Sequence, residues 1–168
     1  MSDLFASDNR FEPATFSPCR TWRLRLERQW GPGPKIGFGL LNPSRGDERE
    51  NDPTIRRLID FGKRWGFGGL VLGNIFALCS TDPAELYAAA DPIGPGNDAA
   101  ILDIANEVGV GNFICGWGVH GAHLGRGATV LKMLRGAGHI PKALRFNADG
   151  SPGHPLYIPA STVPVPFP

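Results

Sequence analysis

The chain alternates between short apolar runs and segments with helical spacing. Apolar residues dominate residues 35–41, 68–78 and 112–118, as expected for strands that are covered on both faces. Residues 20–30 instead alternate apolar and charged positions, which is the pattern of a strand with one buried face. A short last strand is expected over residues 142–146. Together these runs predict the strands of a central sheet.

Helical segments lie between these runs. Residues 52–53 and 82–83 are both Asp-Pro, which places an N-cap residue before a proline at the first helical position. Residues 97–109 and 126–138 show the spacing of amphipathic helices. Strands that alternate with helices predict an α/β fold, a three-layer α/β/α sandwich with a mostly parallel central sheet.

The length and composition are those of one globular domain. A chain of 168 residues with 42% hydrophobic and 20% charged residues can bury a stable core without disulfide bonds or structural metal ions. We expect residues 1–18 to form a loosely ordered arm, residues 19–160 to form a single α/β domain, and residues 161–168 to form a Pro-rich tail. Neither a repeat nor a linker divides the chain.

The three cysteines indicate a reducing compartment. Cys19, Cys79 and Cys115 are odd in number and show no CxxC spacing, so we expect free thiols, without a disulfide framework and without a zinc or iron–sulfur site. The first residues lack the pattern of a signal peptide, and no run approaches the apolar length of a membrane span. These features predict a cytoplasmic protein.

Charge is distributed unevenly although the formal net charge is only +1. Residues 82–107 contain six acids and no Lys or Arg, whereas residues 126–145 contain five bases and no acid. Such asymmetry can create a charged face. Arg126 and Arg135 are therefore candidates for contacts with a nucleic-acid backbone. The alternative is that both segments are helices with ordinary solvated faces.

Polar residues gather where the apolar strands end. In α/β sheets, ligands bind beyond the carboxyl ends of the strands, so these positions predict a site. The residues concerned are Asn42, Pro43 and Ser44 after the first apolar strand, Asn74 in the second, Trp117 and His120 after the third, and His154 in the loop that follows the last strand.

The order of these motifs resembles a bacterial and phage family known as DUF1643. The matching pieces cover most of residues 20–159. They are TWRLRLERQW, LLNPSRGDERENDPTIRR, GGLVLGNIFAL, DPIGPGND, GWGVHG and GHPLYIP. This resemblance implies no reaction, because the family is defined without a known function.

A more distant resemblance is to the uracil-DNA glycosylase superfamily, and it implies a uracil-DNA-glycosylase-like α/β fold. By this likeness, Asn42 and Pro43 lie on a loop that activates water, Asn74 reads the base edge, and His154 supplies a catalytic imidazole. The chain departs from that pattern in having Asn42 where the strongest glycosylases carry Asp, and in lacking clustered cysteines and a Ser after the His-Pro motif.

Each of these three residues also has a structural interpretation. The Asn42 carbonyl could hold water, or its side chain could cap a turn. Asn74 could pair with a pyrimidine edge, or bond to nearby loop backbone. His154 could donate to an anionic leaving base or a phosphate, or be an ordinary surface histidine.

The remaining candidates complete the expected pocket. Asp52 is the carboxylate we expect to act if one is needed, although Asp-Pro-Thr is also a helix start. Ser44 and Arg45 could bind phosphate. Trp117 could stack a base or pack in the core. His120 has no partners at convincing metal-ligand spacing, so no metal is expected.

The sequence thus predicts an enzyme that acts on a nucleobase, a nucleotide or nucleic acid, as a hydrolase of the N-glycosidic bond. It requires no cofactor. One alternative is a nucleotide-binding or base-modification accessory protein without hydrolysis, and another is a non-catalytic nucleic-acid-binding protein. The identity of the base, the choice among DNA, RNA and free nucleotide, the protein partners and the oligomeric state stay open.

Overall fold

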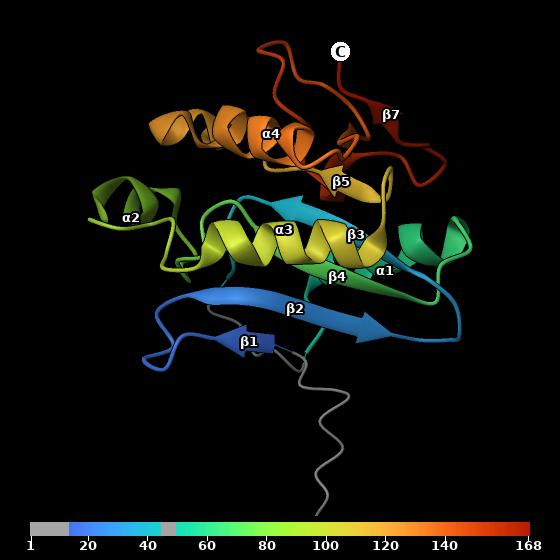
Figure 1. Ribbon diagram of the computed structural model, residues 1–168, viewed down its shortest axis with the longest axis horizontal. Coiled ribbons are helices and arrows are strands. Elements are labelled where there is room, and N and C mark those ends of the chain that lie inside the picture. Colours follow the sequence, from blue (N-terminus) through green and yellow to red (C-terminus); the bar gives the residue numbers. More distant parts are fainter. Residues whose placement is uncertain (1–13, 45–49) are drawn as a thin grey trace, which may run out of the picture.

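A sheet with parallel strands at its centre and antiparallel strands at its edges organises the molecule (Figure 1). The computed structural model describes residues 14–44 and 50–168. Within them, seven strands are ordered β1-β2-β4-β3-β5-β6-β7. The strands are β1 (Ala14–Phe16), β2 (Arg23–Gln29), β3 (Lys35–Leu40), β4 (Gly69–Asn74), β5 (Phe113–Cys115), β6 (Lys142–Ala143) and β7 (Val165–Pro166). The α-helices are α1 (Pro53–Arg64), α2 (Pro83–Ala88), α3 (Asn97–Val108) and α4 (Arg126–Gly136), and 3-10 segments are η2 (Val119–Gly125) and η3 (Pro155–Tyr157).

The sheet is mixed, which corrects the expectation of a mostly parallel sheet. Strands β4, β3, β5 and β6 are parallel to one another, but β2 pairs antiparallel with β4, so that Leu26 lies opposite Leu72. The loop between β2 and β3 spans only residues 30–34. A parallel crossover needs a dozen residues or more, so β3 must run back against the direction of β2. Alternation of apolar residues predicts a strand but carries no information about its direction.

Two hydrophobic cores cover the two faces of the sheet. One core contains Leu58 and Phe61 of α1, packed against Phe38 and Leu70 of the sheet. The other contains residues of α3 and α4, including Ile104, packed on the opposite face. In Figure 1, α3 passes in front of the strands and α1 lies behind them. Helices therefore cover both faces, as the sequence predicts.

Aspartates cap two helices as predicted. The Asp52 carboxylate accepts a hydrogen bond from the backbone N–H of Ile55 at 2.8 Å, at the start of α1. The Asp82 carboxylate accepts one from the N–H of Ala84 at 2.9 Å, at the start of α2. Each side chain satisfies a backbone donor that has no partner inside its helix.

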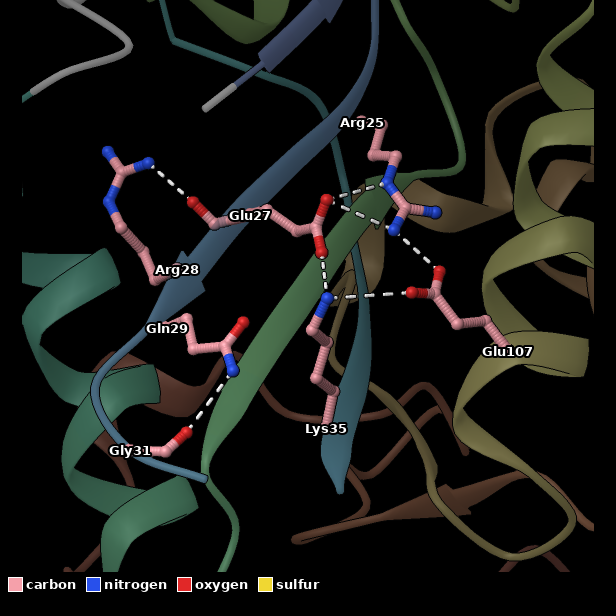
Figure 2. Close-up of polar contacts among 7 residues, drawn as sticks. All are labelled: Arg25, Glu27, Arg28, Gln29, Gly31, Lys35 and Glu107. Atoms are coloured by element: carbon pink, nitrogen blue, oxygen red, sulfur yellow. Dashed lines mark hydrogen bonds and ion pairs between the residues drawn. The ribbon is translucent and has the colours of Figure 1, made fainter. Parts of the chain in front are cut away.

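An ion-pair network links β2, β3 and α3 (Figure 2). It includes Lys35, the first residue of β3. Arg25 contacts Glu107 at 2.5 Å and Glu27 at 3.1 Å. Lys35 contacts Glu27 and also lies 3.6 Å from Glu107. This network stands at the opposite end of β3 from the residues that follow Leu40.

The last residues of the chain join the sheet. Strand β7 pairs antiparallel with β6, and Phe167 stacks on Trp117 with ring centroids 6.3 Å apart. Phe167 also meets Phe146 edge to face at 4.8 Å. The Pro-rich tail expected over residues 161–168 is thus packed against the domain.

The described part of the chain bears on two further predictions. Cys19, Cys79 and Cys115 are all free thiols, as expected. Among the described residues, every helix is too short or too polar to cross a membrane.

Candidate functional site

A pocket of about 710 Å³ opens at the carboxyl ends of β3 and β4. Its size is typical of sites that hold a small molecule or one nucleotide. Parallel strands end at the same edge of the sheet, so their exit loops meet there. The predicted residues that line the pocket are Asn42, Ser44, Asp52, Asn74, Trp117, His120 and His154. Pro43, Arg126 and Arg135 do not line it.

Asn42 ties two exit loops together. Its amide nitrogen donates to the backbone carbonyls of Leu78 and Ser80 at 3.3 and 3.1 Å, and lies 2.9 Å from the Ser80 hydroxyl. Pro43 is buried, and its carbonyl accepts from the Ser80 N–H at 2.9 Å. The nitrogen of Asn42 thus serves the loops, and its carbonyl oxygen is the atom with which it could hold water or a ligand. Its role in catalysis stays a prediction.

The phosphate-binding prediction falls at the edge of the described region. Ser44 is exposed and lines the pocket. Arg45 lies outside the described residues.

Asn74 is the last residue of β4, and it lines the pocket with only 2% of its surface exposed. Its backbone carbonyl accepts a hydrogen bond from the side-chain amide of Asn97 at 2.8 Å. The same Asn97 nitrogen lies 3.2 Å from the carbonyl of Ile75. Asn97 begins α3 and is 1% exposed. A buried amide therefore holds the backbone that presents Asn74.

Arg126 belongs to this buried support rather than to a surface. Its guanidinium Nε donates to the carbonyl of Ile75 at 2.7 Å, and it forms an ion pair with Asp98 at 2.6 Å. Because it is 2% exposed, the predicted contact between Arg126 and a nucleic-acid backbone does not fit this placement. In the sequence, Arg126 cannot be told apart from the other basic residues of α4, because only packing shows which of them points inward. Arg135 is exposed and donates to the carbonyl of Pro168 at 3.0 Å.

His154 faces the pocket from the loop before η3. Its Nδ1 accepts the backbone N–H of Leu156 at 3.2 Å, which assigns the ring proton of the neutral form to Nε2. Burial lowers the pKa of His154, and the nearby Asp52 carboxylate opposes that shift. At neutral pH the ring is therefore an uncharged donor, with its N–H at Nε2.

The His154 loop sits directly on the strand that precedes Trp117. A Cβ atom added to Gly116 would lie only 2.8 Å from the Pro155 ring. The N–H of Gly118 also donates to the carbonyl of Pro152 at 2.8 Å. Glycine at position 116 is required for this close approach. The GWG and GHP motifs are thus two sides of one contact.

Trp117 is mainly a packing residue. It is 4% exposed, and its ring lies against Gly127 and Phe167. His120 also lines the pocket, and its Nδ1 lies 3.1 Å from the Tyr87 hydroxyl. The core-packing interpretation of Trp117 therefore fits its surroundings, and the stacking of a base on its ring stays a prediction.

Several pocket residues were not singled out from the sequence. Arg23 lines the pocket although it is 6% exposed, and Tyr157 lines it with 75% of its surface exposed. Glu50, Asn51 and Thr54 line it from the region where α1 begins. Tyr157 adjoins the His-Pro motif, and its large apolar ring in a loop was the available signal. No such signal marks Arg23, because it looks like any polar position of an alternating strand.

The described residues hold no group of three or more His, Cys, Asp or Glu side chains that could bind a metal ion. Among the polar groups that line the pocket are the imidazole of His154, the carboxylate of Asp52 and the amides of Asn42 and Asn74. This combination can hold a polar, planar ligand and donate a proton to it.

Comparison with known proteins identifies a family but no activity. Neither the curated proteins nor the solved structures contain a significant match to this chain. The likeness to uracil-DNA glycosylases consequently has no support from a structural neighbour. One family model, described as a protein of unknown function, matches residues 23–156. Because this match spans most of the chain, the protein belongs to the DUF1643 family.

Proposed function

We propose that the pocket binds a nucleobase and that the protein is a hydrolase of the N-glycosidic bond, with a uracil-DNA-glycosylase-like site. The observation that supports this most directly is that Asn74, His154 and Asp52 line one pocket. They are three separate functional groups: a buried amide, a neutral imidazole with an N–H at Nε2, and a carboxylate. The substrate is a base that is joined to a sugar, in a nucleotide or in nucleic acid.

Asn74 would recognise the base. An amide offers two N–H donors and a carbonyl acceptor, so it can pair with a base edge that presents a carbonyl beside a ring N–H. Its backbone is held by Asn97, which restricts the direction of the side chain. A base without the matching groups would leave the buried amide unpaired, at a cost of about 1–3 kcal/mol.

His154 would stabilise the leaving base. Breaking the glycosidic bond leaves the electron pair on the base and positive charge on the sugar. The neutral His154 ring would donate its Nε2 proton in a hydrogen bond to the oxygen or nitrogen where negative charge develops. The water oxygen would bond to the anomeric carbon, and the proton that water loses would pass to Asp52. The Asn42 carbonyl would position that water.

Binding without hydrolysis is the second candidate, and one observation favours it. The two side chains that would position and deprotonate the water already have structural roles, since Asn42 bonds to the 78–80 loop and Asp52 caps α1. A pocket with these groups committed could bind a nucleotide without turnover. A non-catalytic nucleic-acid-binding protein that relies on Arg126 and Arg135 has less support, because Arg126 is buried in an ion pair.

The test is release of free base. The protein would be incubated with single- and double-stranded oligonucleotides that contain uracil, hypoxanthine, or oxidised or alkylated bases, and with a panel of nucleotides. Released bases would be identified by mass spectrometry. We expect release that is lost in His154→Ala and Asp52→Asn. His123→Ala is the matched control, because His123 packs on Phe76 and Tyr87 and does not line the pocket.

Two outcomes would contradict the hydrolase. Absence of release from every substrate, together with saturable binding of a nucleotide, would support the second candidate. Release that survives in His154→Ala would show that the imidazole does not act on the leaving base.

A further inference from the structure

A second, shallower hollow of about 520 Å³ lies on α1 and η3. Its walls carry two positive charges against one carboxylate. The lining residues are Pro53, Arg56, Arg57, Asp60 and Leu156. We refer to these five residues as the arginine groove.

Both arginines are held in place by backbone carbonyls. An Nη of Arg56 donates to the carbonyl of Asn51 at 2.6 Å, and an Nη of Arg57 donates to the carbonyl of Ile158. The Arg57 guanidinium also lies 5.1 Å from the centre of the Phe61 ring. Each guanidinium keeps further N–H groups, because it carries five donors in a planar fork. The side chains are thus fixed before a ligand arrives.

One donor of Arg57 has no protein partner. Within the described part of the chain, the Nε of Arg57 is buried and makes no hydrogen bond. Leaving a buried donor unpaired is costly, and the cost is greater for a charged group. A ligand in the groove would contact the part of Arg57 that lines it, because this Nε has almost no exposed surface.

The arginine groove and the pocket share a wall. Pro53 and Leu156 line the groove, whereas their chain neighbours Asp52, Thr54 and Tyr157 line the pocket. Adjacent residues lie only about 3.8 Å apart along the chain. At residues 52–54 and at residues 156–157, therefore, neighbouring residues of the chain line the two different hollows. A single ligand can reach across this wall, past the exposed ring of Tyr157.

We infer that the arginine groove binds a phosphate ester of the ligand whose base occupies the pocket. Arginine forks match the geometry of phosphate oxygens, and one phosphate supplies enough acceptors for both guanidinium groups. Asp60 opposes this charge and keeps the affinity for phosphate moderate. The substrate class is consequently a nucleotide or a nucleic-acid strand, and free bases and nucleosides bind more weakly.

This inference rests on the proposed function only in placing a base in the pocket. Its experiment measures binding and not base release. A protein that hydrolyses nothing can therefore still confirm it, and a confirmed hydrolase can still contradict it.

The experiment is a competition assay on the intact chain. A short fluorescent single-stranded oligonucleotide of mixed sequence is the probe, and binding is followed by fluorescence polarisation. The competitors are a mixture of the common 5′-mononucleotides and the same mixture of nucleosides. Competition by mononucleotides would identify a single nucleotide phosphate as the ligand, whereas binding of the strand alone would identify a phosphodiester.

The variants separate this site from general charge. Arg56→Gln should weaken binding of the phosphate ligand about tenfold, through the loss of a charge-assisted hydrogen bond. Arg57→Lys keeps the charge but removes the planar fork of N–H donors, and it should also weaken binding. Asp60→Asn should strengthen it severalfold. Arg64→Gln is the matched control, since Arg64 lies on the same helix outside the groove and its loss should change affinity little.

Three results would overturn the inference. The first is equal weakening by Arg56→Gln and Arg64→Gln, which would indicate only non-specific attraction. The second is unchanged affinity in Arg56→Gln and Asp60→Asn. The third is a wild-type protein that binds neither the oligonucleotide nor the mononucleotides, or that binds nucleosides as well as mononucleotides.

Discussion

The side-chain amide of Asn97, at the start of α3, donates to the backbone carbonyl of Asn74, at the end of β4, over 2.8 Å. This hydrogen bond lies at the edge of the sheet where the pocket opens. Asn97 also lies within hydrogen-bonding distance of the carbonyl of Ile75, which Arg126 contacts as well. A buried polar cluster therefore fixes the backbone beneath the candidate base-reading residue.

Removing the Asn97 amide should destabilise the fold and disturb the pocket. Asn97→Ala removes the side-chain donor to the buried carbonyl of Asn74, whereas the carbonyl of Ile75 keeps its bond from Arg126. We therefore expect the free energy of unfolding to fall by about 1–3 kcal/mol in urea titrations. Gln29→Ala is the control, because Gln29 is exposed and its side-chain amide donates to the nearby carbonyl of Gly31 (Figure 2). Equal stability of the two variants would contradict the structural role of Asn97.

Gly116 should tolerate no larger side chain. Its alanine variant would press a methyl group into Pro155, so either β5 or the His154 loop must move. We expect Gly116→Ala to lose about 1–3 kcal/mol of stability and to weaken ligand binding in the pocket. Gly136→Ala is the control because the space around Gly136 is open, and it should be neutral or slightly stabilising. A Gly116→Ala protein with unchanged stability and binding would show that the contact can relax freely.

His154 should titrate below the usual pKa of histidine, and Asp52 should set how far below. Burial lowers this pKa and the Asp52 carboxylate raises it, so Asp52→Asn should lower it further. Asn is also a good N-cap, so α1 should keep its start. Nitrogen–proton NMR of the ring over a pH series measures the pKa and identifies the Nε2–H tautomer. Glu50→Gln is the control, and a pKa that rises in Asp52→Asn would contradict the pairing.

The same shift predicts a pH dependence of stability. A histidine whose pKa is lower in the folded state binds protons more readily when unfolded. The contribution of the neutral ring to stability is therefore fully present when the pH is above the pKa of the unfolded state. It is lost as the pH falls through the pKa of the folded state. The stability difference between wild type and His154→Gln should change over this interval. A difference that is constant with pH would show that burial of His154 does not favour the neutral ring.

The ion-pair network of Figure 2 should contribute stability at neutral pH and lose it in acid. Burial by itself would raise the pKa of Glu27, but the hydrogen bond from Lys35 and the charge of Arg25 outweigh it, and the net shift is downward. The contribution is therefore present above the unfolded pKa and lost as the pH falls through the folded pKa. We expect Glu27→Gln to cost about 0.5–1 kcal/mol at neutral pH. Urea titrations at neutral and acidic pH measure this, and a cost that does not diminish in acid would contradict the pairing.

The sequence by itself determined where most elements lie and how two helices begin. Apolar runs and Asp-Pro pairs are local signals, because burial of a strand and capping of a helix depend on neighbouring residues. The same reasoning placed Asn42 and Asn74 at strand ends and His154 in the loop after the last strand, and the structure brings all three to one pocket.

Only the tertiary structure decided the direction of β2, the burial of Arg126 and the place of Arg23 in the pocket. Strand direction depends on pairing with β4, which is distant in the sequence. In the sequence Arg126 looks like the other bases of α4, but in the fold it points inward, bonded to the carbonyl of Ile75 and paired with Asp98. The tautomer and the pKa of His154 could not be predicted from the sequence either. The tautomer depends on one backbone N–H, and the pKa depends on burial beside Asp52. Except for the tautomer of His154, these properties depend on contacts between segments that are distant in the sequence, and hydrophobic periodicity does not encode such contacts.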